Sequence, residues 1–321
     1  MPLSGTCLTL RRPAHPGEGR HPTLSAEAPM FSHSDRRPIA LGLDPDPSHR
    51  MALAWAADEA VRRRVPMRVV LAEEAPVEGS AWRHILPVRE DWNEAFNKAG
   101  RHALEEATAF VTARHPELEV STVLAEGDPV SVLREQSRSA SAVVLGSRHL
   151  SRTQEVFGSA SVALPVMAHT HCPMVVVPEP EHTTQSPAYY VVGVDGSEHS
   201  AAAVDFAFAE AALRGAELRA LLVWEPSPLR SVQGKKPPRE YRRLLAETVA
   251  GRQSHFPEVN LRHELVVGHP VQVLAHASAH ALGLVVGTRG HGGFRDMLLG
   301  SVSQGVLHHA RCPVIAVPKS R

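Results

Sequence analysis

This chain of 321 residues has few cysteines, no long apolar run and no excess of basic residues. Its three cysteines are too few for a disulfide framework, so the sequence predicts a reducing, cytoplasmic location. No apolar run reaches the ~18 residues that span a bilayer, and the N-terminus lacks the continuous apolar segment of a secretory signal. The 34 basic residues balance the 34 acidic ones, which argues against a nucleic-acid partner.

The first 35 residues show neither helical nor strand periodicity. They are rich in Pro, Gly, His, Ser and Arg, a composition that buries too little apolar surface to order a chain. We therefore expect a disordered tail over residues 1–37.

The rest of the chain repeats itself. Three segments of the first half return in the second half: 39–48 as 191–200, 127–148 as 268–289, and 160–178 as 300–318. Such an internal repeat predicts two homologous domains, 38–178 and 189–318. A polar linker, 179–188, separates them, and a short tail, 319–321, follows the second.

Each unit alternates short apolar runs with helical patterns. In the second unit, YYVVGVD at 189–195 predicts a buried strand, and an apolar helix face follows, starting near Ser200 and stopping at Gly215. The continuous Val, Ile and Leu content of the strands indicates a parallel sheet covered on both faces. With right-handed crossovers, each unit becomes a doubly wound α/β domain.

A spaced set of glycines follows the fourth predicted strand of the second unit, with the pattern Gly287-x2-Gly290-x9-Gly300-Ser301. Doubly wound sheets bind ligands beyond the carboxyl ends of their strands, so we expect these residues to share a crevice with Asp195. Gly287 and Gly290 have no Cβ to keep a ligand away and can adopt positive φ.

A helix that starts on Ser301 would offer free N–H groups to an anion. The Ser301 hydroxyl and the Arg289 guanidinium would add charge-assisted hydrogen bonds. The pattern therefore predicts a phosphate cradle, although the chain has no Walker motif. The alternative is a surface loop whose glycines bind nothing.

Together these segments resemble the universal stress protein family, and the second unit matches the glycine signature of its ATP-binding branch. The resemblance covers nearly all of the chain after residue 37. It implies two tandem five-stranded parallel sheets of the adenine nucleotide alpha hydrolase-like type, and ATP, with Mg²⁺, between strands one and four. It also implies that the units pair through their last strands, 174–177 and 314–317, as an intramolecular pseudo-dimer, with a homodimer of the chain left open.

The resemblance also assigns nucleotide contacts residue by residue. Asp195 would contact the ribose or adenosine side, Val223 would lie near the adenine, and the glycines and serines would hold the phosphates. The implied set is Gly193, Val194, Asp195, Val223, Val286, Gly287, Arg289, Gly290, Gly300, Ser301, Val302 and Ser303.

The first unit departs from this pattern. It keeps Asp44 and Gly146, but His149 replaces the second glycine. A gap-free alignment of the following helix puts Ala160-Ser161 at the Gly300-Ser301 position, while Gly158-Ser159 is the alternative. Either Ala72 or Glu73 takes the place of Val223. We expect a degenerate half that is kept for pairing and stability, with Asp44, Gly146 and Ser161 as its weaker contacts.

Other functions remain open at this point. A slow ATPase or nucleotidyl-transfer enzyme would need a residue that activates water or substrate, and the sequence offers no specific candidate, so no catalytic residue is assigned. A nucleotide-free interaction module, or binding of cyclic AMP, would leave the phosphate cradle partly or wholly unused. A zinc site is the remaining alternative, judged weaker than buried packing, with six candidate ligands: His169, His171, Cys172, His308, His309 and Cys312.

The sequence thus favours a regulatory protein of the stress response. Its predicted partners are an adenine nucleotide and a protein that the sequence does not name, with neither nucleic acid nor membrane among them.

Overall fold

The computed structural model describes residues 36–44, 46, 50–73, 89–147, 162–179, 183–226, 239–290 and 299–319. Of the predicted tail over 1–37, residues 1–35 lie outside these ranges. So do Ser161 and His149 of the first unit's loop.

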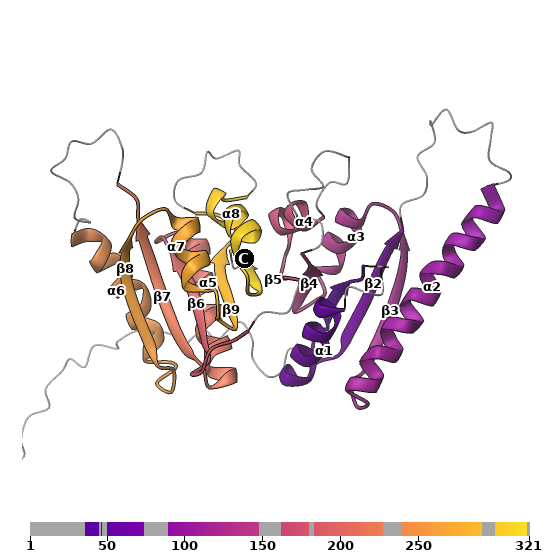
Figure 1. The fold of residues 1–321 in the computed structure, drawn as a ribbon, viewed down its shortest axis with the longest axis horizontal. Helices are drawn as coiled ribbons and strands as arrows, with labels where there is room; N and C mark the ends of the chain where they lie inside the picture. The colour runs from indigo at the N-terminus through magenta and orange to yellow at the C-terminus, as the bar shows by residue number, and fades with distance from the viewer. Residues whose placement is uncertain are drawn as a thin grey trace, which may run out of the picture.

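The described residues alternate strands and helices as the sequence pattern predicts (Figure 1). The first unit contains β1 (Ile39–Gly42), α1 (Met51–Arg63), β2 (Met67–Glu73), α2 (Arg89–Arg114), β3 (Val120–Glu126), α3 (Pro129–Gln136), β4 (Ala142–Gly146), α4 (Ala163–His169) and β5 (Met174–Val177). The second contains β6 (Tyr189–Val194), α5 (Glu198–Arg214), β7 (Glu217–Trp224), α6 (Arg239–Gln253), β8 (Leu261–Val267), α7 (Pro270–Ala277), β9 (Gly283–Gly287), α8 (Ser301–His309) and β10 (Val314–Val317). None of the helices in the described ranges is long and apolar enough to cross a membrane.

All ten strands form one sheet, in the order β3-β2-β1-β4-β5-β10-β9-β6-β7-β8. Strands within each unit are parallel, which confirms the predicted sheet type. The two units join where β5 and β10 pair antiparallel, with Val175 opposite Ile315. Because β6 lies between β7 and β9, the strand order reverses there, and β1 has the same place between β2 and β4. Each unit therefore has one switch point beyond the carboxyl end of its first strand.

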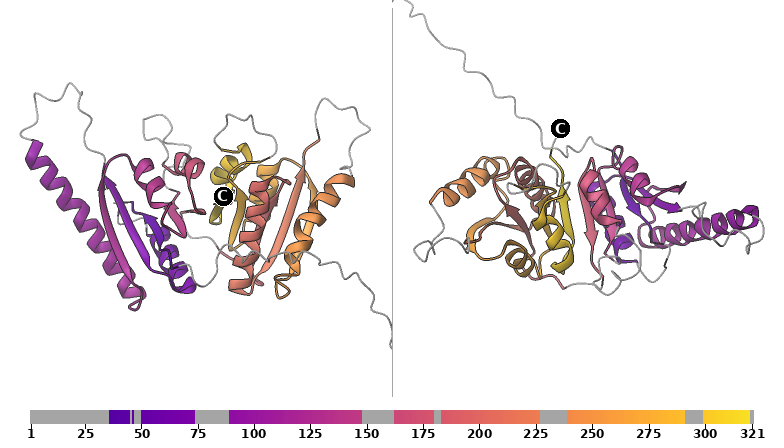
Figure 2. Two further views of the ribbon diagram at one scale, coloured as in Figure 1. Left: turned by 180° about the vertical axis from the view of Figure 1, so that it is seen from behind. Right: turned by 90° about the horizontal axis from the view of Figure 1, so that it is seen from above.

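Helices cover both faces of this sheet (Figure 2). Successive strand residues point to opposite faces, so Tyr190 and Val192 pack in one apolar layer and Tyr189 and Val191 in the other. Residues of α1, α2, α5 and α6 complete the first layer, and residues of α3, α4, α7 and α8 the second. Each layer runs through both units, so the halves share their cores across the β5–β10 junction.

Helix α5 begins three residues earlier than the helix start predicted at Ser200. Its N-cap is Ser197, whose Oγ accepts a hydrogen bond from the Ser200 N–H at 3.1 Å. The Ser200 hydroxyl instead accepts from the N–H of Asp195 at 3.1 Å. Two serines three residues apart both suit a cap, and only the path of the preceding chain selects the first of them.

Helix α5 ends at Gly215, as predicted, in the left-handed conformation with φ 59°. The equivalent residue after α1 is Arg64, with φ 57°. A side chain at this φ costs about 1–2 kcal/mol, because Cβ crowds the next carbonyl.

Glycine at position 64 is therefore expected to raise the free energy of unfolding by about 0.5 kcal/mol, after the greater unfolded-state entropy of glycine is subtracted. Urea unfolding followed by circular dichroism measures the change. Gly215→Arg is the matched reciprocal variant and should lower the free energy of unfolding. A destabilised Arg64→Gly protein would contradict this reading of the α1 terminus.

A cluster of four buried charged residues joins α1 to α5 at the junction of the units. Arg63 donates to Glu59 at 2.5 Å and also to Glu210 of the other unit. Arg214 donates to Glu210 and, across the junction, to Glu59. The two glutamates are only 1% and 2% exposed. We call Glu59, Arg63, Glu210 and Arg214 the junction cluster.

Candidate functional site

The switch point of the second unit lies between β6 and β9, and Asp195 follows β6 directly. Its Oδ1 accepts a hydrogen bond from the Ser197 N–H at 2.9 Å, and its own N–H is held by the Ser200 hydroxyl. The side chain remains exposed. The first turn of α5 therefore fixes the carboxylate beyond the carboxyl end of β6, in the region between the ends of β6 and β9 that we call the crevice.

The glycines at the end of β9 and in the loop after it are required by close packing and not by an unusual backbone conformation. A Cβ at Gly287 would lie 2.7 Å from the carbonyl carbon of His199, and one at Gly290 would overlap the Asp195 carboxylate. Neither residue has a positive φ, so the prediction that these positions use that freedom was wrong. What excludes a side chain is the N-terminal part of α5, which comes close to the β9 loop.

Helix α8 begins at Ser301, as predicted, but its N-cap is Gly300 rather than a serine. Gly300 has φ −71°, and its N–H donates to the Thr288 carbonyl at 2.9 Å. Glycine has no side chain to accept from the first N–H groups of α8. A Cβ at Gly300 would lie 3.5 Å from the Gly290 nitrogen, so the N-terminus of α8, with the positive end of its helix dipole, lies beside the loop that follows β9.

The remaining predicted contacts border the same crevice or its floor. The Ser303 hydroxyl donates to the Gly287 carbonyl at 2.6 Å, which ties α8 to the end of β9. Arg289 is exposed beside Gly290, and Val223 lies one residue beyond Leu222, which pairs with Val194. The others sit at the carboxyl ends of strands or in the first turn of α8: Gly193, Val286 and Val302.

The sequence interpretation missed three polar residues beside this crevice. His199 follows Glu198 in the first turn of α5, and Lys319, assigned to the tail, forms an ion pair with Glu198. Burial lowers the pKa of His199, and the nearby charges of Arg289 and Lys319 lower it further. One signal in the sequence pointed to Lys319: it follows the repeat Val-Pro at the position that Glu179 holds in the first unit.

The first unit keeps the aspartate but has little room beside it. Asp44 accepts from the Asp46 N–H at 3.0 Å, the same turn that Asp195 makes. The cavity at this switch point measures about 20 Å³, room for about one water. Glu179 lines it together with Asp44 and Gly146. Strand register places Ala72, rather than Glu73, at the position of Val223.

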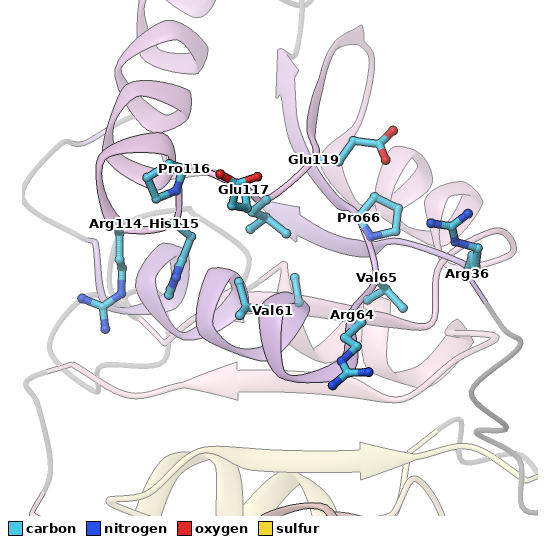
Figure 3. A pocket seen from close by; sticks show the side chains of 12 residues that line it. Arg36, Val61, Arg64, Val65, Pro66, Arg114, His115, Pro116, Glu117 and Glu119 are labelled. Atoms are coloured by element: carbon cyan, nitrogen blue, oxygen red, sulfur yellow. The ribbon is translucent and has the colours of Figure 1, made fainter.

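A larger cavity of about 520 Å³ lies at the opposite edge of the first unit, beside the amino ends of β2 and β3 (Figure 3). The Arg114 and His115 side chains that line it each bond to Asp58 at 2.7 Å. Those contacts hold the end of α2 against α1. This cavity is remote in the fold from both switch points, because strands separate the two edges of the sheet.

The zinc alternative finds little support in the described residues, which contain no group of three metal-type side chains that could hold an ion. His169 and His309 each place Nδ1 against a carbonyl of their own helix. Burial raises the pKa of Cys172 to about 12 and that of Cys312 to about 11. Both thiols are therefore protonated at neutral pH and are poor metal ligands.

Comparison with known proteins gives consistent matches in both halves. Residues 35–178 and 190–318 match the model of the universal stress protein family. A universal stress protein of Mycobacterium tuberculosis is 34% identical over 296 residues, 88% of this chain and 97% of that protein. Another from this species is 32% identical over 304 residues, 91% and 99% of the two chains. The crystal structure of a universal stress protein from Archaeoglobus fulgidus shares the fold, with a TM-score of 0.68 at 18% identity over 90% of this chain and 99% of that one.

Proposed function

The chain belongs to the universal stress protein family, and from that premise we propose that it is a tandem member that binds ATP with Mg²⁺, mainly in its second unit. Its two domains span 38–178 and 189–318, with the linker at 179–188. Occupancy of the second domain regulates which protein partner the chain joins in the stress response. We place it in the cytoplasm because its three cysteines are too few for a disulfide framework.

The fit of Gly290 against Asp195 is the observation that carries this proposal. A Cβ at position 290 would meet the Asp195 carboxylate, so the backbone of the loop after β9 lies directly beside that carboxylate. An aspartate suits the hydroxyl groups of a ribose, and the N-terminus of α8 suits phosphate. The two features together fit a nucleotide better than either a bare sugar or a bare anion.

Each chemical part of the nucleotide has candidate partners in the chain. Val223, half-buried at the end of β7, supplies an apolar contact for the base, while Val194, buried in the opposite core layer, lines the end of β6. Backbone N–H groups at Ser301 and Val302, with the Arg289 guanidinium, supply donors for the phosphates. Mg²⁺ would enter already bound to the nucleotide phosphates, which together with water commonly supply most of its ligands. The first unit offers a cavity of about 20 Å³ at the equivalent place, which is why the proposal favours one site per chain.

The antiparallel pairing of β5 with β10 supports a second part of the proposal. Within one chain, the first unit takes the place of a partner protomer, which makes the molecule an intramolecular pseudo-dimer. Sedimentation velocity, which reports both mass and shape, tests this arrangement: a compact monomer supports it, and an extended shape with separate domains opposes it. A homodimer would show at twice the mass.

Isothermal titration of the purified chain with ATP and Mg²⁺ tests the nucleotide site. We expect about one equivalent. Asp195→Ala should weaken binding about tenfold, because hydrogen bonds to a charged group contribute about 1.5–3 kcal/mol. Asp44→Ala is the matched variant at the equivalent turn of the first unit and should bind as the unaltered chain does.

Other outcomes would redirect the proposal in defined ways. Two equivalents, with one lost in Asp44→Ala, would mean that both units bind nucleotide. If cyclic AMP binds more tightly than ATP, cyclic AMP and not the triphosphate is the ligand. If no adenine nucleotide gives a heat of binding or stabilises the chain against unfolding, a nucleotide-free interaction module would be favoured.

A further inference from the structure

One position carries opposite charges in the two units. The segment MVVVPE ends at Glu179, and the repeated segment VIAVPK ends at Lys319. The sheet register makes these residues equivalent, since Val177 pairs with Gly146 and Val317 pairs with Gly287. Each charge therefore stands two residues beyond the last strand of its unit, next to the start of the loop that follows β4 or β9.

In the first unit this position faces the switch-point crevice. Glu179 lines the small cavity there, and its Oε1 lies 3.9 Å from where a Cβ of Gly146 would be. The Glu179 N–H donates to the Ser147 hydroxyl at 3.2 Å, which holds the segment against the loop. A carboxylate at this point would repel a phosphate group by Coulomb repulsion.

In the second unit the same position brings a cation to the nucleotide crevice. The Val317 carbonyl accepts from the Thr288 N–H at 3.0 Å, so the chain leading to Lys319 runs beside the first residues of the β9 loop. Lys319 pairs with Glu198, one residue before His199, whose backbone touches the Gly287 position. Lys319 and Arg289 thus flank the same end of α5.

We infer that this position selects ligands by charge: Lys319 binds the terminal phosphates of a nucleoside triphosphate in the second unit, and Glu179 disfavours polyphosphates in the first. The inference rests on the proposed nucleotide function and adds to it the group that distinguishes a triphosphate from a monophosphate.

Glu198 has a defined part in this selection. It holds Lys319 at the rim of the crevice, with the lysine and glutamate side chains 52% and 74% exposed. An exposed pair of this kind is weak, so a terminal phosphate carrying more charge can compete for the ammonium group. A single phosphate held at the N-terminus of α8 leaves the Lys319–Glu198 pair intact. Binding of AMP should therefore be insensitive to both residues.

Titration with ATP and with AMP, each with Mg²⁺, tests the selection. Lys319→Gln should weaken ATP binding about tenfold. Lys319→Glu should weaken it about a hundredfold, because it gives this position the negative charge that Glu179 has in the first unit. AMP binding should stay within about twofold in Lys319→Gln. Glu198→Gln should strengthen ATP binding about threefold by releasing the lysine. Lys98→Gln, an exposed lysine on α2, is the matched control and should change neither affinity.

The results separate this inference from the function on which it rests. If Lys319→Gln leaves the ratio of ATP to AMP affinity unchanged, the selection by Lys319 is refuted while the nucleotide site stands. If the unaltered chain binds no adenine nucleotide, both are refuted. Because Lys319 is exposed, unchanged circular dichroism is expected for each variant and excludes a loss of fold as the cause.

Discussion

Glu210→Ala is expected to lower the free energy of unfolding by about 3–5 kcal/mol, the range typical when one member of a buried ion pair is removed. The Glu210 carboxylate accepts from both arginines of the junction cluster, one from each unit. Alanine would leave two guanidinium groups, each about nine-tenths buried, to share the single carboxylate of Glu59.

The physical reason is the cost of holding an uncompensated charge away from water. Burial raises the pKa of Glu210, whereas at Glu59 the charges of Arg214 and Arg63 outweigh burial and hold the pKa below its ordinary value. The guanidiniums also stack on rings, with Arg63 5.7 Å from the centre of Phe206 and Arg214 5.4 Å from that of Tyr190. Each arginine is therefore fixed on several sides and cannot turn to solvent cheaply.

Urea unfolding followed by circular dichroism measures this effect. Glu247→Ala is the matched control, because Glu247 forms an i,i+4 pair with Arg243 on α6 with both side chains exposed. That variant should change the free energy of unfolding by no more than about 0.5 kcal/mol. Near-equal values for the two variants would show that the junction cluster contributes no more than a surface ion pair.

Gly290→Asp is expected to weaken ATP binding more than a hundredfold. Its Cβ would overlap the Asp195 carboxylate, and its own carboxylate would enter the space that the proposal gives to phosphate. Two effects combine: the Asp195 carboxylate or the loop must move, and the crevice gains a negative charge. Isothermal titration with ATP and Mg²⁺ provides the measurement.

Two further variants separate these causes and control for the substitution itself. Gly290→Ala adds only the Cβ and should weaken binding less than Gly290→Asp. Gly251→Asp makes the same change at an exposed glycine of α6, where an added Cβ meets no neighbour within 4 Å, and should bind ATP normally. Unaltered affinity in Gly290→Asp would remove the main support for the second-unit site.

The glycine spacing shows how far sequence reasoning reached in the site. It predicted that the loop after β9 would lie beside Asp195, because strand order places the carboxyl ends of β6 and β9 side by side. It gave the glycines two roles, a missing Cβ and a positive φ, and the structure shows no positive φ at either: a Cβ at Gly287 would meet His199 of α5, and one at Gly290 would meet Asp195. Steric exclusion by a segment almost ninety residues away leaves no local pattern in the sequence.

Sequence reasoning also missed Lys319 and the junction cluster. The repeat aligns Lys319 with Glu179, but only the register of β10 with β9 brings Lys319 beside the loop that follows β9. Glu59 and Arg63 look like an ordinary i,i+4 pair on a helix surface. They are buried only because α1 meets α5 across the β5–β10 junction.

By itself, the sequence determined the two repeated units, through their self-similarity, and also the strand and helix alternation, the parallel sheet type and the end of α5 at Gly215. Backbone propensity and apolar periodicity act over a few residues, so they can be read along the chain. Only the tertiary structure decided which residues crowd the glycine loop, which charge enters each crevice and which ion pairs are shielded from water. Those properties depend on contacts between segments that are distant in the chain, and sheet register and helix packing bring such segments together.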